Sequence, residues 1–318
     1  MGLKEQNYGH EPVLLTIVEK YCGLKKGDTV IDCTLGLGGH SEMFLKQIGD
    51  KGILVAFEQD ENNLKIAKER LNKNKNKIYF FHDNFVLLQT EIDKIDEIAL
   101  KGADVIFFDL GLASTHVDAS ERGFSFQSDG PLDMRFDTRN RLTAEELLRK
   151  YSEKRLEEIF KLYGEERFAK KFAHIIKRNL PIRTTKQLAD LIQRNSPRPK
   201  FYGKKPIHPA TRIFQALRIE VNKELDVLES ALLQAIQILK KGGRLMVISY
   251  HSLEDRIVKN VLRDASKECI CPPEVPRCVC NHKPEISILT KKPIQPDEAE
   301  IQNNPRSRSA KMRIAEKM

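Results

Sequence analysis

The feature that most constrains the fold is an alternation, between residues 12 and 110, of short apolar runs with longer amphipathic segments. Runs such as Thr29-Val30-Ile31 and Val105-Ile106-Phe107-Phe108 are typical of strands that helices cover on both faces. Strands and helices that alternate in this way form βα units and a parallel sheet. We expect strands at 28–33, 53–58, 78–82 and 103–109, and helices at 12–22, 39–48, 61–73 and 85–97.

The alternation stops near residue 112 and resumes near residue 244. Between these points we expect a Gly/Ser/Asp-rich loop at 120–137, helices at 143–161, 164–178 and 184–194, and one long helix at 209–240 with apolar residues three and four apart. A strand at 244–249, a helix at 252–264 and two short apolar runs in the tail follow. The sequence therefore predicts an α/β, Rossmann-like sheet domain of residues 1–111 and 207–318, interrupted by an inserted all-helical domain of residues 112–206.

The charge balance favours an anionic partner. The chain has 54 Lys and Arg against 45 Asp and Glu, a net charge of +9, and acid-free basic runs at 194–206 and in the C-terminal tail. No apolar run reaches the length of about 18 residues that spans a membrane, and residues 1–12 lack the apolar segment of a signal peptide. Six cysteines are too few for a disulfide scaffold of 318 residues. We expect a cytoplasmic protein that binds nucleic acid and no membrane.

A glycine-rich turn follows the first predicted strand, in the segment Asp32-Cys-Thr-Leu-Gly-Leu-Gly-Gly-His40. Glycine lets the backbone approach a ligand closely, and the following helix offers free N–H donors. A dinucleotide site would need glycine where the chain has Ser41, and Asp32 would repel a diphosphate. Asp32 suits a cationic ligand instead, such as S-adenosylmethionine. A purely structural turn is the alternative.

Two further acidic residues end predicted strands. Glu58 follows the second strand, where a carboxylate can accept hydrogen bonds from both ribose hydroxyls of an adenosine. Asp109 ends the fourth strand, and Asp60 is interpreted as the N-cap of the next helix. Because the carboxyl ends of parallel strands share one edge, Asp32, Glu58 and Asp109 converge there, which indicates a nucleoside-cofactor site more than three coincident caps.

The remaining chemistry-bearing cluster is Cys269-Ile-Cys271 and Cys278-Val-Cys280. Four thiolates can complete a tetrahedral zinc site, but one intervening residue is fewer than the usual two to four or so. Free thiols in a loop are the alternative, and we assign no metal ligand from the sequence.

Long motifs along almost the whole chain resemble the bacterial 16S rRNA (cytidine-N4)-methyltransferases of the RsmH or MraW family. They are His10-Glu-Pro-Val-Leu14, Asp32 to His40, Asp109-Leu-Gly111, Glu121-Arg-Gly-Phe-Ser-Phe126, Asp129-Gly-Pro-Leu-Asp-Met-Arg135, His208-Pro-Ala-Thr-Arg212, Phe214 to Ile219, His251-Ser-Leu-Glu-Asp-Arg256 and Asn304 to Lys311.

The resemblance implies S-adenosyl-L-methionine as cofactor and 16S rRNA of the small ribosomal subunit as substrate. It implies that the methionine end of the cofactor lies against Gly38, Gly39 and His40, the ribose at Glu58, the adenine at Phe85 and the methyl group beside Asp109. The chain departs from the family at His116, where a cofactor-contacting glutamine is usual, and mildly at Glu58 (usually Asp) and Tyr250 (usually Phe). An imidazole can still make one hydrogen bond, so we keep His116 as a contact.

The resemblance implies N4-methylation of a cytidine in the decoding region, at the P site. Methylation of a pyrimidine at carbon 5 generally needs a cysteine nucleophile, whereas an exocyclic amine attacks a sulfonium methyl directly once it is positioned. Cys33 is interpreted as packed, so the residues favour transfer to nitrogen or oxygen, with Asp109 as the catalytic residue. The alternatives are a non-catalytic rRNA-binding assembly factor that retains the cofactor pocket and, disfavoured by Ser41 and Asp32, a nicotinamide dehydrogenase.

The sequence leaves two interpretations of its basic residues: they bind RNA phosphates, or they form a solvated basic surface. The candidates are Arg212, Arg218, Arg306, Arg308, Lys311 and Arg313. The loop Arg122-Gly-Phe-Ser-Phe126 could stack an unpaired base or serve only as a packing anchor. His251 could contact the target base or be packed.

Overall fold

The computed structural model describes residues 11–197, 208–269, 271, 279–280 and 282–318. The chain divides into two compact units, which we describe separately: the first contains residues 1–111 and 225–318, and the second contains residues 112–224. None of the helices in the described ranges is long and apolar enough to span a membrane.

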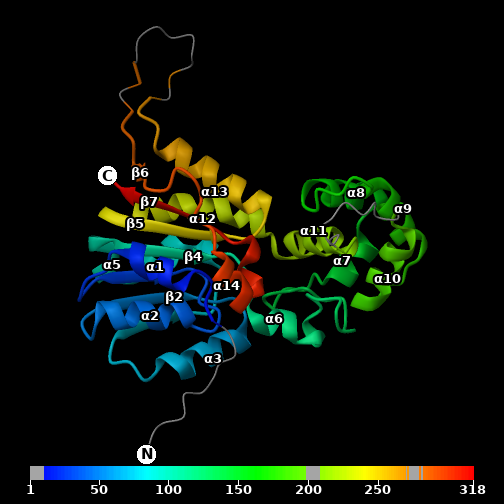
Figure 1. The fold of residues 1–318 in the computed structure, drawn as a ribbon, viewed down its shortest axis with the longest axis horizontal. Coiled ribbons are helices and arrows are strands. Elements are labelled where there is room, and N and C mark those ends of the chain that lie inside the picture. Colours follow the sequence, from blue (N-terminus) through cyan, green and yellow to red (C-terminus); the bar gives the residue numbers. More distant parts are fainter. Residues whose placement is uncertain (1–10, 198–207, 270, 272–278, 281) are drawn as a thin grey trace, which may run out of the picture. The chain divides into compact units, whose positions relative to one another are not determined.

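The first unit contains one seven-stranded sheet with the strand order β3-β2-β1-β4-β5-β7-β6 (Figure 1). Strands β1 to β5 run parallel, and β7 runs antiparallel to both β5 and β6. This arrangement confirms the predicted α/β sheet. The strands are β1 (Thr29–Asp32), β2 (Ile53–Phe57), β3 (Lys77–Phe81), β4 (Ala103–Asp109), β5 (Leu239–Ser249), β6 (Ile286–Ile288) and β7 (Lys311–Lys317).

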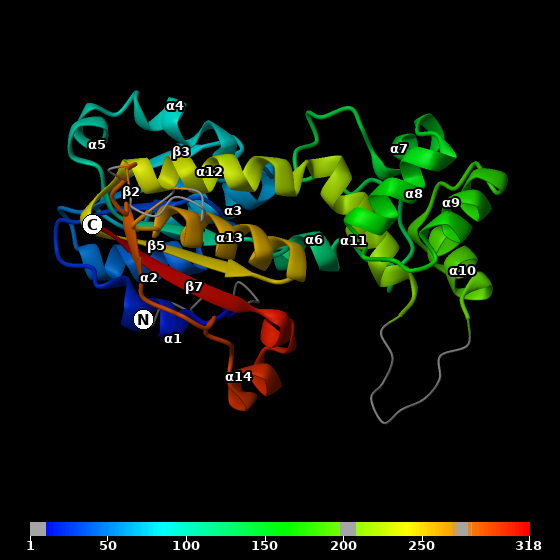
Figure 2. The same ribbon diagram turned by 90° about the horizontal axis from the view of Figure 1, so that it is seen from above.

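Helices cover both faces of this sheet (Figure 2). Successive strand residues face opposite sides, so Val30 and Phe107 join one core while Ile31 and Phe108 join the other. The first core is completed by α1 (Leu15–Cys22), α2 (Gly39–Ile48) and α3 (Glu61–Leu71). The second is completed by α4 (Leu88–Ile92), α5 (Asp96–Lys101), α12 (Glu224–Ile238) and α13 (Ser252–Ala265). The unit also contains η1 (Phe85–Leu87), α14 (Glu298–Asn303) and η3 (Pro305–Ser309).

The second unit has its own apolar core, and its described elements are helical apart from one isolated β-bridge between Pro131 and Thr184. The expected helix at 143–161 is two helices, because the Ser152 side chain accepts a hydrogen bond from the Arg155 N–H and begins a new one. The elements are α6 (Ser114–Asp118), η2 (Ser120–Arg122), α7 (Ala144–Lys150), α8 (Glu153–Leu162), α9 (Ala169–Arg178), α10 (Thr185–Asn195) and α11 (Ala210–Asn222).

The expected long helix at 209–240 is also interrupted. Lys223 adopts a left-handed conformation with φ 54°, which ends α11 before α12 begins. Leu217 and Val221 of α11 lie in the core of the second unit, whereas Leu228 of α12 lies in a sheet core. The second unit therefore extends to Glu224, beyond the boundary that the sequence placed at residue 206.

Candidate active site

The strand order reverses between β1 and β4, which are neighbours in the sheet although β2 and β3 separate them in the chain. Open α/β sheets bind ligands at the carboxyl ends of the strands on either side of such a point. Asp32 ends β1, Glu58 directly follows β2 and Asp109 ends β4. The register places Asp32 beside Ala56 of β2 and Phe107 of β4, so the three carboxyl groups lie at one edge as expected.

The turn after β1 depends on its glycines. Gly36 and Gly38 have φ values of 54° and 79°, which side-chain-bearing residues rarely adopt. Gly38 also precedes the first residue of α2, and a Cβ atom on Gly39 would lie 2.4 Å from Cγ of Pro12. Backbone N–H groups at the start of α2 are therefore presented at the carboxyl edge without side chains in the way.

Asp32 organises this turn. Its side chain is 1% exposed and accepts hydrogen bonds from the Ser41 hydroxyl at 2.7 Å and from the Thr34 N–H at 3.1 Å. Burial raises the pKa of the carboxyl, while the hydrogen bond from Ser41 opposes the shift. The carboxylate thus links the end of β1 to the first turn of α2, and its suitability for a cationic ligand stays a prediction.

Glu58 has the geometry of an acceptor that faces the site. The half-buried carboxylate accepts the Gly36 N–H at Oε2 and the Asp60 N–H at Oε1, both at 2.8 Å. Burial raises the pKa of Glu58 to about 8. Each carboxylate oxygen can accept more than one hydrogen bond, so hydroxyl donors can still be bound. Asp60 caps α3 by accepting the N–H groups of Asn62 and Asn63, which confirms its interpretation as an N-cap.

The side chains of His40 and Asp109 place two hydrogen-bond acceptors, Nδ1 and Oδ2, near each other. Nε2 of His40 lies 3.0 Å from the Val13 carbonyl, which can only accept, so Nε2 carries the proton. Burial lowers the pKa of His40, and the neutral ring then presents Nδ1 as an acceptor 3.7 Å from Oδ2 of Asp109. Two acceptors at this separation suit a cationic donor between or beside them.

Asp109 is held by two further groups. Its N–H donates to Oγ1 of Thr34 at 2.6 Å, and the Tyr250 hydroxyl donates to its Oδ1 at 2.8 Å. Burial and the nearby Asp109 charge raise the pKa of Tyr250 well above its usual value, so the phenol stays protonated as a donor. A Cβ atom on Gly111 would lie 2.7 Å from the Tyr250 ring. Sequence reasoning gave Tyr250 no role, although its place directly after β5, the neighbour of β4, was the available signal.

Phe85 follows β3 at the same edge of the sheet. Its ring is 8% exposed and meets Phe108 edge-to-face, with the ring centroids 5.5 Å apart. Most of the ring therefore serves the core, and contact with an adenine stays a prediction.

His116 lies in the second unit, on α6. Its buried ring packs against Phe124 and Phe136 with centroid separations of 5.0 and 5.1 Å. Phe126 packs against Phe214, and Arg122 donates to the Arg135 and Phe136 carbonyls. The two phenylalanines of the loop are thus packed inside this unit, and the contact of His116 with the cofactor stays a prediction.

Several candidate RNA contacts have protein partners. His251 caps α13 by accepting the Glu254 N–H, Arg218 pairs with Glu224 through two 2.9 Å contacts, and Arg313 pairs with Asp255 at 2.7 Å. Arg212 lies 4.0 Å from Glu166, and Lys311 lies 3.7 Å from Asp255. Arg306 and Arg308 are exposed on η3. Most of the basic segment 194–206 lies outside the described residues.

Known proteins resemble this chain over almost its whole length. The model of the MraW methylase family matches residues 7–318. A protein of Caldicellulosiruptor saccharolyticus named Ribosomal RNA small subunit methyltransferase H is 49% identical over 316 residues, which cover 98% of this chain and all of that protein. The protein of that name from Halothermothrix orenii is 43% identical over 312 residues, 97% of this chain and 98% of its own.

The doubly wound sheet, its glycine turn and its acidic strand ends, together with these relatives, define an S-adenosylmethionine-dependent methyltransferase. The chain belongs to the MraW methylase family. The nicotinamide dehydrogenase alternative is thereby excluded.

Proposed function

We propose that this protein methylates N4 of a cytidine in the decoding region of 16S rRNA, at the P site of the small ribosomal subunit, in the cytoplasm. The family and the names of its relatives support methylation of small-subunit rRNA. The observation that carries the chemistry is the carboxylate of Asp109, which accepts the Tyr250 hydroxyl and lies 3.7 Å from His40 at the point where the strand order reverses.

The donor set fits S-adenosylmethionine, whose chemical contribution is a methyl group activated by a sulfonium charge. We assign the ribose hydroxyls to Glu58 and the methionine end to Gly38, Gly39 and His40. The Nδ1 acceptor of neutral His40 suits an ammonium donor. Phe85 is assigned to the adenine, and His116 is proposed from the family resemblance alone.

The same residues favour an amine as the methyl acceptor. Cys33, the cysteine beside Asp32, is 2% exposed, and burial raises the pKa of its thiol well above the usual value. A buried thiol with a raised pKa is a poor nucleophile. Activation of a pyrimidine at carbon 5 by Cys33 is therefore disfavoured, and direct attack by an exocyclic nitrogen needs only orientation.

Asp109 supplies that orientation in our proposal. The Asp109 carboxylate, which the Tyr250 hydroxyl positions, accepts a hydrogen bond from the N4 amine and directs the nitrogen lone pair toward the methyl group. The new C–N bond forms as the C–S bond breaks, and the amine then releases one proton. A fixed carboxylate also favours the positive charge that develops on this nitrogen.

We assign RNA binding to the inserted unit and to the exposed arginines of η3. Lys311 of β7 pairs with Ser249 at the end of β5, so η3, which directly precedes β7, lies at the carboxyl edge of the sheet. Arg308 is exposed there and can contact phosphate.

Asp109→Asn tests the catalytic assignment. We expect a single-turnover rate about a hundredfold lower than that of the wild type, with cofactor affinity reduced far less, because the amide is a weaker acceptor. Asp96→Asn, on the exposed first turn of α5, is the control and should keep the wild-type rate. A near-normal rate for Asp109→Asn with unchanged cofactor affinity would show that Asp109 has no such role.

A further inference from the structure

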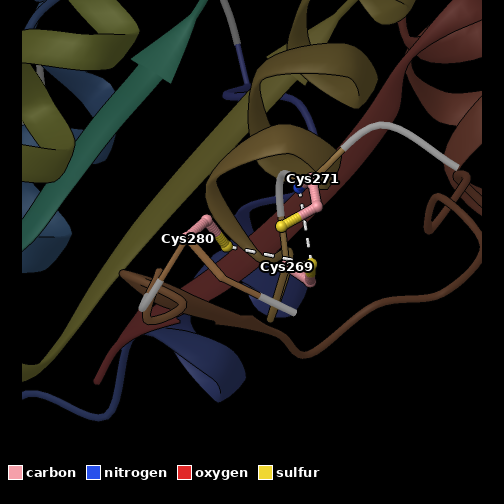
Figure 3. A group of neighbouring side chains, drawn as sticks. All are labelled: Cys269, Cys271 and Cys280. Carbon is pink, nitrogen blue, oxygen red and sulfur yellow. Dashed lines mark hydrogen bonds between the residues drawn. The ribbon is translucent and has the colours of Figure 1, made fainter. Parts of the chain in front are cut away.

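Three cysteines in the connection between α13 and β6 form a cluster that the methyl-transfer site does not use. The sulfur atoms of Cys269, Cys271 and Cys280 all lie within 4.8 Å of one another. Figure 3 shows the three side chains converging, with their sulfur atoms on the inside of the group. Cys278, the other cysteine of this connection, lies outside the described residues and is not part of the inference.

The one sulfur–sulfur distance that is known in detail matches a metal site. The sulfur atoms of Cys269 and Cys280 are 3.8 Å apart. Thiolates bound tetrahedrally to zinc at about 2.3 Å lie about 3.8 Å from one another. A disulfide bond would need a separation of about 2 Å, so these two sulfur atoms are not joined by one.

Backbone donors are directed at two of these sulfur atoms. The N–H of Cys271 lies 3.4 Å from the sulfur of Cys269, and the N–H of Val279 lies 3.4 Å from the sulfur of Cys271. Hydrogen bonds of this kind stabilise thiolates, the form of cysteine that binds metal, and orient them as ligands. One residue between Cys269 and Cys271 is fewer than in most zinc sites, which counts against a site. The contact between the Cys271 N–H and the sulfur of Cys269 nevertheless forms with this short spacing.

The ligand atoms indicate which metal the site would bind. Three sulfur donors favour soft or borderline cations over magnesium or calcium, which take oxygen ligands. We propose that Cys269, Cys271 and Cys280 bind one Zn²⁺ ion. This site uses none of the residues assigned to the proposed methyl transfer.

Metal content of the full-length protein tests the proposal. Protein purified without chelators, from medium supplemented with zinc, should contain about one zinc per chain by inductively coupled plasma mass spectrometry. Cys271→Ser and Cys280→Ser should each lose most of this zinc. Cys22→Ser, which changes a buried cysteine on α1, is the matched control and should keep it.

Cobalt substitution reports the ligands directly. Co²⁺ bound at this site should give a near-ultraviolet sulfur-to-cobalt absorption that Cys271→Ser weakens and Cys22→Ser preserves. Retained cofactor binding shows that each variant is folded. The proposal is overturned if wild-type protein neither contains zinc nor binds Co²⁺, or if Cys271→Ser and Cys280→Ser keep full zinc. Loss of two hydrogens by intact mass, without metal, would equally overturn it and identify a disulfide.

Discussion

The protonation state of Glu58 should depend on whether the cofactor is bound. Its burial at the end of β2 raises its pKa from 4.5 to about 8, so that most of it is protonated at pH 7. In the proposed complex, ribose hydroxyls would donate to the ionised form, and a nearby sulfonium charge would favour that form as well. Binding of the cofactor should therefore release a proton at pH 7.

We predict that cofactor affinity rises as the pH approaches 8 and levels off above it. Isothermal titration calorimetry at pH 7, in buffers of different ionisation enthalpy, should show the proton release. Glu58→Gln should abolish it and weaken binding about tenfold or more. Glu61→Gln, an exposed neighbour on α3, should behave as wild type. The same enthalpy in every buffer for the wild type would contradict this account of Glu58.

We propose that Tyr250 acts on the reaction through Asp109. Its hydroxyl donates to the Asp109 carboxylate at 2.8 Å and so fixes the position of this group. Tyr250→Phe should therefore lower the single-turnover rate about tenfold, while cofactor affinity changes little. A wild-type rate in this variant would show that the contact does not influence the reaction.

For single residues, the sequence predicted where the acidic side chains lie in the sheet better than it predicted their hydrogen-bond partners. Asp32, Glu58 and Asp109 were expected at one edge because parallel strands share their direction, and they lie there. What each side chain bonds to depends on neighbours distant in sequence, such as Tyr250 for Asp109. The burial of Asp32 and its hydrogen bonds within the turn after β1 could not be predicted from the sequence either.

At the level of elements, the turn between β1 and α2 is fixed by close packing. A Cβ atom on Gly39 would lie 2.4 Å from Cγ of Pro12, so Gly39→Ala should displace one of the two segments. We expect the free energy of unfolding to fall by about 1–3 kcal/mol, together with weaker cofactor binding. Chemical denaturation and cofactor titration measure the two effects.

The double variant Pro12→Ala with Gly39→Ala separates a clash from other causes. Removal of the proline ring should restore part of the lost stability, which a double-mutant cycle detects as a favourable coupling. Additive losses would indicate that the contact between these two residues is not the source of the effect.

The positions of strands were easier to predict than the breaks within helices. Strands at 28–33, 53–58, 78–82 and 103–109 correspond to β1 to β4, because buried apolar runs mark them strongly. The breaks at Ser152 and Lys223 were missed, because apolar periodicity continues across each of them while a cap or a left-handed residue ends the helix. At these two positions the local backbone conformation, and not the apolar periodicity, decides where the helix ends.

At the level of the whole molecule, the chain divides into two units, and α11 belongs to the inserted unit, whereas the sequence analysis placed residues 207–318 in the sheet domain. The net charge of +9 coexists with carboxylates at the carboxyl edge of the sheet, which is consistent with our proposal that the basic excess binds RNA. Arg218 and Arg313 are engaged in ion pairs, which sequence alone could not reveal because their acidic partners are set by the fold.

The most direct test of the account is methyl transfer to its proposed substrate. Small ribosomal subunits from cells that lack this protein should be incubated with the purified protein and isotopically labelled S-adenosylmethionine. Nuclease mapping and mass spectrometry of nucleosides then identify the product. We predict one labelled N4-methylcytidine in the decoding region of 16S rRNA, and none with Asp109→Asn on the single-turnover timescale of the wild type. A label at carbon 5 or on another base, or no transfer by the wild type, would contradict the account.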